Sequence, residues 1–72
     1  MKIDAYIYRG ILYTIETNKN GSLTFKAENF LTQLKETYYF YKKSDAKKKF
    51  KFLINYYFFF DDNEKQLNKH LL

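Results

Sequence analysis

The chain has no cysteine, no proline and no tryptophan, and it has only two glycines. Without cysteine no disulfide can stabilise the fold, and thiolate zinc sites are excluded. Two glycines are too few for a glycine-rich nucleotide-binding loop. A chain of 72 residues without disulfides has a small core, typically worth about 3 to 5 kcal/mol. We therefore expect a small protein that a binding partner stabilises.

Long apolar runs are also missing. The longest, Leu53 to Phe60, is interrupted by Asn55 and is much shorter than the roughly 20 residues of a membrane helix. Near the N-terminus, Asp4 and Arg9 interrupt the apolar stretch that a signal peptide requires. We expect no signal peptide and no transmembrane segment, and a location in the cytoplasm or the plastid stroma. The abundance of Lys, Asn, Phe, Tyr and Ile is typical of an AT-rich genome and suits a phage-type or plastid-type protein.

Aromatic and basic residues are what the chain has in excess. Eight tyrosines and eight phenylalanines are more rings than one small core can enclose, so some of them should lie on the surface. The net charge is +5, and the stretch from Lys35 to Lys51 alone has seven basic and two acidic side chains. Such a basic segment attracts acidic protein faces, phosphates or anionic lipid surfaces.

Alternating residues near the N-terminus predict antiparallel strands. From Ile3 to Glu16, β-branched and aromatic residues dominate an alternating pattern. Arg9-Gly10 interrupts this run, and we interpret it as a bulge or bend, with a tight hairpin turn as the alternative. The Asn-Gly pair within Asn18 to Gly21 predicts a type I′ hairpin turn, and Leu23 to Glu28 would form the returning strand.

The middle of the chain is less regular. Residues 27–36 have apolar side chains spaced as in a helical turn, with an irregular linker as the alternative. Thr37 to Tyr41 alternates again and predicts a strand whose two faces are both aromatic. Ser44, which is followed by Asp45, is a typical helix N-cap.

The clearest helical pattern runs from about residue 45 to residue 60. Six apolar side chains fall in one sector of about 120°, which would pack on the sheet. These are Ala46, Phe50, Leu53, Ile54, Tyr57 and Phe60. Residues 49–60 are also rich in strand formers, so a strand is the alternative there. The tail, residues 61–72, would form a short C-terminal helix capped by Asp61, or a frayed end.

A second aromatic group on this helix is the candidate partner-binding surface. It lies in a different sector from the core-facing group, and one sheet face cannot cover both. Exposed apolar area marks interaction sites, and nearby lysines would direct it to an acidic face. The predicted partner-binding residues are Phe52, Tyr56, Phe59, Lys47, Lys48 and Lys51. The alternative is that the tail or the segment from Phe30 to Leu34 covers these rings.

The start of the same helix is a second candidate site. Free backbone N–H groups and lysines at a helix start attract phosphate or carboxylate groups. The predicted anion-binding residues are Lys42, Lys43, Ser44, Lys47 and Lys48. Solvated lysines are the simpler interpretation. The alternative function is therefore a small nucleic-acid-binding protein that contacts phosphates through Lys42 to Lys51, although Arg9 is the single arginine available for base recognition.

No arrangement of residues predicts catalysis or a metal site. Ser22 and Ser44 have no activating base nearby in the sequence. Asp61 to Glu64 lacks the glycine turn and the alternating oxygens of a calcium loop, and His70 has no second ligand. We predict no catalytic residues, no metal and no cofactor.

The predicted fold is α+β, a small antiparallel sheet of about three strands packed on one main helix. One domain would include residues 1–72. The predicted function is non-catalytic. The protein would dock on a larger protein or complex with an acidic face, as an accessory subunit, adaptor or inhibitor. A homodimer formed through the second aromatic group is a further alternative.

Overall fold

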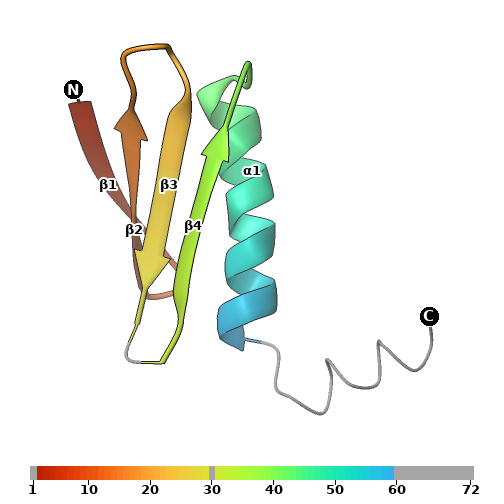
Figure 1. Cartoon of the computed structure of the whole chain (residues 1–72). Helices are drawn as coiled ribbons and strands as arrows, with labels where there is room; N and C mark the ends of the chain where they lie inside the picture. Colours follow the sequence, from red (N-terminus) through yellow and green to blue (C-terminus); the bar gives the residue numbers. More distant parts are fainter. Residues whose placement is uncertain (1, 30, 60–72) are drawn as a thin grey trace.

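Four antiparallel strands and one helix form the described part of the chain, residues 2–29 and 31–59 of a computed structural model. The strands are β1 (Lys2–Tyr8), β2 (Ile11–Thr17), β3 (Leu23–Glu28) and β4 (Gln33–Tyr38), and they lie side by side in this order (Figure 1). Helix α1 (Lys43–Ile54) continues as a π-helical turn, η1 (Asn55–Phe59). The α+β prediction is confirmed, with one strand more than expected. The predicted C-terminal helix lies outside the described residues.

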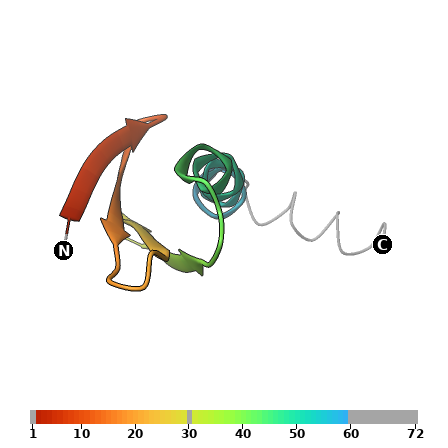
Figure 2. The same cartoon turned by 90° about the horizontal axis from the view of Figure 1, so that it is seen from above.

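The sheet is curved, and α1 lies on its concave face (Figure 2). Because successive side chains of a strand point to opposite faces, one residue in two faces the helix. The two central rows of this inner face contain Tyr6, Tyr13, Ala27 and Leu34, and next to them Asp4, Ile15, Phe25 and Glu36. The core therefore lies between the inner face of β2 and β3 and one side of α1.

Phe50 lies at the centre of this core and is fully buried. Its ring centroid is 5.0 Å from that of Phe25 and 5.7 Å from that of Tyr13. Ala46 and Ile54, one turn before and one turn after Phe50, are also fully buried. The core stripe predicted from the helical spacing is confirmed at these three positions.

The π-helical turn changes which rings the end of the helix buries. Side chains in a π-turn advance around the axis by a smaller angle than the roughly 100° per residue of an α-helix. Phe58 therefore packs against the core, whereas Tyr57, which α-helical spacing placed in the core, is exposed. The prediction for Tyr57 was wrong for this reason. Phe60, also predicted in the core, lies outside the described residues.

The turn between β1 and β2 is a two-residue hairpin. Tyr8 and Ile11 are direct partners, and both residues between them have positive φ, 53° at Arg9 and 80° at Gly10. Positive φ at both central positions is the geometry of a type I′ turn. The bulge or bend that we favoured for Arg9-Gly10 is therefore wrong, and the hairpin alternative is right.

The second hairpin is confirmed, but its turn type is not. In the β2–β3 connection the N–H of Gly21 donates to the carbonyl of Asn18 at 3.0 Å, and Gly21 has φ 87°. Asn20 is not in the positive-φ region that a type I′ Asn-Gly turn requires. Instead, its carboxamide oxygen accepts hydrogen bonds from the N–H and the hydroxyl of Ser22. This side-chain contact holds Asn20 in a different turn.

The middle of the chain departs most from the prediction. Instead of a helical turn in 27–36, β3 runs to Glu28 and β4 begins at Gln33. Asn29 makes the reversal, because its side-chain oxygen accepts hydrogen bonds from the N–H groups of Leu31 and Thr32. The predicted strand from Thr37 to Tyr41 is correct only at Thr37 and Tyr38.

The start of the helix also differs in detail. The N-cap residue is Lys42, which has no side-chain capping bond, and its carbonyl accepts from the N–H of Ala46 at 3.0 Å. Ser44 lies inside the first turn, so its predicted role as cap is wrong. The alternative of a strand over residues 49–60 is also excluded for 49–59, which are helical.

The convex face of the sheet has no helix on it in the described part of the chain (Figure 2). Along the β1 edge this face is apolar. Ile3 and Ile7 have 63% and 74% of their surface exposed, and Leu12, the direct partner of Ile7, is exposed as well. At the β4 end the same face has Gln33, Lys35 and Thr37. The two edges of the sheet therefore differ in chemistry.

Two tyrosines on the inner face of the sheet make the free energy of unfolding depend on pH in the alkaline range. Burial, with a smaller contribution from Tyr6, raises the pKa of Tyr13, and burial raises the pKa of Tyr38 beside Glu36 and Tyr41. Unfolded tyrosine titrates near pH 10. Above that pH the unfolded chain loses protons that the folded chain keeps, so stability is complete below about pH 10 and declines as pH rises through the folded pKa values.

We therefore expect the free energy of unfolding, measured by urea titration from neutral pH to about pH 11, to decrease at the alkaline end. Tyr13→Phe combined with Tyr38→Phe should make this decrease shallower, because neither ring can then ionise. Tyr39→Phe, at an exposed ring, is the matched control and should keep the wild-type profile. An unchanged alkaline slope in the double variant would contradict this expectation.

Candidate functional site

The structure separates the six predicted partner-binding residues onto different sides of the helix. Lys47 and Lys51 face β1 and are partly buried. Phe59 also turns toward β1, where it lies under Arg9. Phe52 and Lys48 point outward and are exposed, whereas Tyr56 is half-buried and packs edge-on against Tyr57. These residues do not form one continuous ridge.

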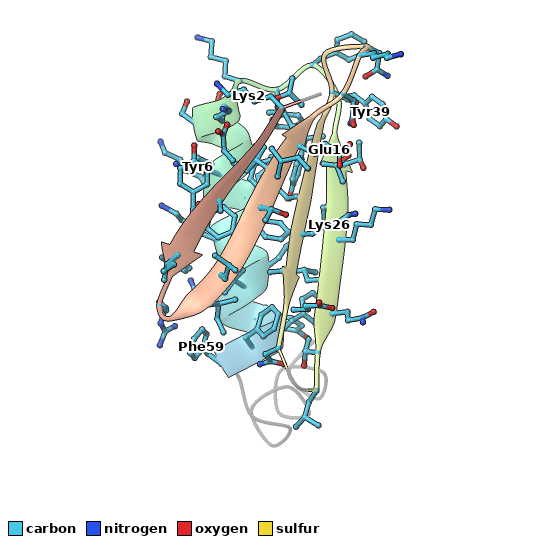
Figure 3. The ribbon with its side chains drawn as sticks, turned by 90° about the vertical axis from the view of Figure 1, so that its left-hand side faces the viewer. Lys2, Tyr6, Glu16, Lys26, Tyr39 and Phe59 are labelled. Atoms are coloured by element: carbon cyan, nitrogen blue, oxygen red, sulfur yellow. The ribbon has the colours of Figure 1, made fainter. Side chains whose placement is uncertain are left out.

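The residues that face β1 form a row of contacts with it. Helix positions four residues apart share one side, and alternate strand positions share one face. The Nζ of Lys43 is 3.2 Å from a carboxylate oxygen of Asp4. One turn later, the Nζ of Lys47 is 3.9 Å from the ring centroid of Tyr6 (labelled in Figure 3).

The row continues to the end of the described helix. The Nζ of Lys51 is 5.3 Å from the ring centroid of Tyr8. The amide of Asn55 donates to the hydroxyl of Tyr8 at 3.1 Å, and its oxygen accepts from Arg9 at 2.7 Å. The Arg9 guanidinium carbon is 3.9 Å from the ring centroid of Phe59. Several of the predicted binding residues thus hold β1 against the helix.

Some lysines of the predicted anion-binding site are engaged in the same contacts with β1. Lys43 is paired with Asp4 and Lys47 lies on Tyr6. Lys42, Ser44 and Lys48 remain exposed around the helix start. Two of the lysines near the helix start, Lys43 and Lys47, therefore have partners on β1, which accounts for their positions without a bound anion.

The connection from β4 to α1 presents three consecutive rings to solvent. Tyr39, Phe40 and Tyr41 are all exposed, and Phe40 has a relative exposure of 105%. In Figure 3, Tyr39 lies at the end of the molecule opposite Phe59. Phe40 also has φ 63°, the left-handed region, which costs a bulky residue about 1 to 2 kcal/mol.

Arg9 is the other described non-glycine residue with positive φ, and the comparison is informative. The backbone strain at Arg9 is compensated by side-chain contacts, because its guanidinium donates a hydrogen bond to Asn55 and stacks on the ring of Phe59. The side chain of Phe40 is fully exposed and has no hydrogen bond or ring contact among the described residues. Unrelieved backbone strain at an exposed side chain is typical of functional positions.

The exposed rings continue onto the helix. The ring centroids of Tyr41 and Tyr38 are 5.5 Å apart, and the Nζ of Lys49 is 5.5 Å from the Tyr41 centroid. Lys49 and Phe52 then line a shallow groove between α1 and β4, together with Glu36, Tyr38 and Leu53. Phe52 is 68% exposed. We call Tyr39, Phe40, Tyr41, Lys49 and Phe52 the aromatic surface.

Replacing Phe40 should stabilise the protein. Asparagine tolerates the left-handed region better than phenylalanine, and no packing is lost at a fully exposed side chain. We expect Phe40→Asn to increase the free energy of unfolding by up to about 1 kcal/mol, measured by urea titration. Arg9→Asn is the matched control, and it should destabilise because it removes the contacts with Asn55 and Phe59. A loss of stability in Phe40→Asn would contradict the idea that the strain is unrelieved.

Of the aromatic surface, Phe52 was among the predicted partner-binding residues, and Lys49 lies within the segment Lys42 to Lys51 that the alternative function uses. Tyr39, Phe40 and Tyr41 were assigned to a strand and were not among the predicted partner-binding residues. The signal was present, because the predicted strand had aromatic residues on both faces. One helix covers one face of a sheet, so about half of those rings had to be exposed or to leave the strand.

No described helix has both the length and the apolar character needed to cross a membrane. Within residues 2–29 and 31–59, no three His, Cys, Asp or Glu side chains come together as metal ligands. Asp61 to Glu64 and His70, considered above, lie outside the described residues.

No protein-family model, curated protein or solved structure matches the chain. The functional inference therefore depends on the residues and their geometry.

Proposed function

We propose that the chain is a non-catalytic binding protein that docks on a larger protein through the aromatic surface. The observation that carries this proposal is Phe40, a fully exposed ring held in a strained backbone conformation between two other exposed rings. Strain at a position without structural benefit is explained when the side chain contributes to binding. Aromatic residues are also enriched in the cores of protein interfaces.

The charges around the aromatic surface favour an acidic partner. Lys42 follows the three rings directly, and Lys48 is one helical turn before Phe52. Both lysines are exposed, as is Lys49 within the surface. Apolar rings surrounded by lysines fit a partner with an apolar pocket and an acidic rim, where the rings supply affinity and the lysines accelerate association.

Binding to nucleic acid through the same lysines is the competing function. Exposed rings can stack bases, and exposed lysines can contact phosphates. Three of the basic side chains that this function would use, Lys43, Lys47 and Lys51, are engaged with β1. The single arginine is bonded to Asn55. These contacts favour protein docking over phosphate binding.

Affinity capture of the tagged chain from its native lysate, with and without nuclease, separates the two functions. We expect to capture a protein in stoichiometric amount that remains after nuclease treatment. The variant that combines Phe40→Ser with Phe52→Ala should no longer capture it. Leu31→Ala is the control and should still capture the protein. Leu31 is an aliphatic residue in the β3–β4 connection and is 86% exposed. Recovery of nucleic acid alone, lost with nuclease and with increasing salt, would overturn the proposal.

A further inference from the structure

The outer edge of β1 has backbone N–H and C=O groups that are not paired with any described strand. β1 is the first strand of the sheet, and within the described residues it pairs with β2 alone. Because a two-residue turn makes Tyr8 and Ile11 a hydrogen-bonded pair, alternate residues back along β1 bond to β2. Ile3, Ala5 and Ile7 therefore direct their N–H and C=O groups to the open edge. Such an edge is a template for another strand.

The side chains of these three residues are apolar and lie on the convex face, which no described helix covers. Ile3 and Ile7 are mostly exposed, Ala5 is exposed between them, and Leu12 extends the apolar area onto β2. Folded proteins usually protect an edge with charges, proline, a bulge or a short strand. β1 has seven residues and no proline, and every residue from Lys2 to Tyr8 has a partner in β2, so no bulge interrupts it.

The sequence of β1 is self-complementary in an antiparallel arrangement. A two-fold axis at Ala5 places Ile3 opposite the partner's Ile7, and it pairs all seven residues of the strand. On the other face, Asp4 lies opposite the partner's Tyr6, and Lys2 opposite the partner's Tyr8. No like charges face each other directly. Moving the axis to Asp4 would place two carboxylates opposite each other, which is unfavourable.

We infer that β1 pairs with β1 of a second copy of this chain, so that the two sheets join into one antiparallel sheet in a two-fold dimer. The dimer covers the open backbone edges and makes the apolar strips of the two copies continuous. The interface is separate from the aromatic surface, which remains available in both copies.

Because the chain contains no cysteine, introduced thiols test both the dimer and its register. Opposite residues of a hydrogen-bonded antiparallel pair have Cα atoms about 5.5 Å apart, which a disulfide can bridge. Ala5→Cys alone should form a disulfide-linked dimer on mild oxidation. Ile3→Cys and Ile7→Cys should each form little, because like thiols are then roughly 13 Å apart. A mixture of these two variants should cross-link.

Leu31→Cys, an exposed thiol far from β1 in the sequence, reports random collision. We expect Ala5→Cys to cross-link at least about tenfold faster than this control at the same protein concentration, because the dimer raises the effective thiol concentration. Equal rates for the two variants would overturn the dimer. Efficient cross-linking of Ile3→Cys alone would overturn the register.

The solution mass of the cysteine-free protein provides the second test. Light scattering should show a dimer whose fraction rises with concentration. Ala5→Pro should be monomeric yet folded by circular dichroism, because it removes an N–H that points away from β2. A wild-type chain that stays monomeric at every concentration would overturn the proposal and leave the edge to a strand of another protein.

Discussion

Phe50→Ala is expected to unfold the protein or to remove most of its stability. The side chain is fully buried and packs on the rings of Tyr13 and Phe25. Truncating a buried phenylalanine to alanine costs about 3 to 5 kcal/mol, the sum of lost transfer free energy and the cavity left behind. A core of this size supplies a total of only about 3 to 5 kcal/mol. Circular dichroism with urea titration measures the result.

Phe52→Ala is the matched control two residues along the same helix. Its side chain is mostly exposed, and surface substitutions usually change stability by less than about 0.5 kcal/mol. The two variants therefore separate core from surface within one helical turn. If Phe52→Ala destabilised the chain as much as Phe50→Ala, Phe52 would belong to the core and the aromatic surface would lose its helical part.

Phe40→Ser combined with Phe52→Ala is expected to abolish docking while the protein remains folded. Anchors at the centre of an interface contribute at least about 2 kcal/mol each when truncated, which is roughly 30-fold in affinity. Both side chains are exposed, so the fold should not suffer. Calorimetric titration of the captured partner measures the affinity. Wild-type affinity in this double variant would exclude the aromatic surface as the docking site.

The lysines beside the anchors are expected to act mainly on the association rate. Lys48→Glu combined with Lys49→Glu should slow association with an acidic partner and have less effect on dissociation. Lys26→Glu combined with Lys35→Glu is the charge-matched control. These two exposed lysines are direct partners on the convex face of the sheet, and their replacement should have a smaller effect. If both pairs of substitutions slowed association equally, the net charge of the protein, and not the position of Lys48 and Lys49, would determine the association rate.

The sequence was sufficient for the parts of the fold that a strong local pattern specifies. Ala46, Phe50 and Ile54 were correctly assigned to the core because they repeat at the helical period. The β2–β3 hairpin was correctly located by its Asn-Gly pair. Both predictions depend on residues that are near each other in the chain.

The errors at β4 and at the end of the helix share a physical cause, which is contact between residues on different elements. Most of β4, from Gln33 to Glu36, was missed, because these mostly polar residues are held in the strand by pairing with β3 rather than by their own strand propensity. The π-helical turn rotates Phe58 to the core and Phe59 toward Arg9, which no α-helical spacing predicts.

The candidate site was only partly predictable for the same reason. The sequence predicted lysines around the start of the helix, but not that Lys43, Lys47 and Lys51 would contact Asp4, Tyr6 and Tyr8 of β1. The exposure of Phe40 depends on where β4 ends. Composition correctly indicated surface aromatic residues, and the structure shows which they are.

Photo-cross-linking from position 40 in the native cell tests the docking proposal most directly. A photoreactive phenylalanine analogue replaces Phe40 in one variant and Leu31, in the β3–β4 connection, in the control. We predict a discrete protein adduct from position 40, unaffected by nuclease, and none of that mass from position 31. Adducts with nucleic acid, or the same adducts from both positions, would contradict docking through the aromatic surface.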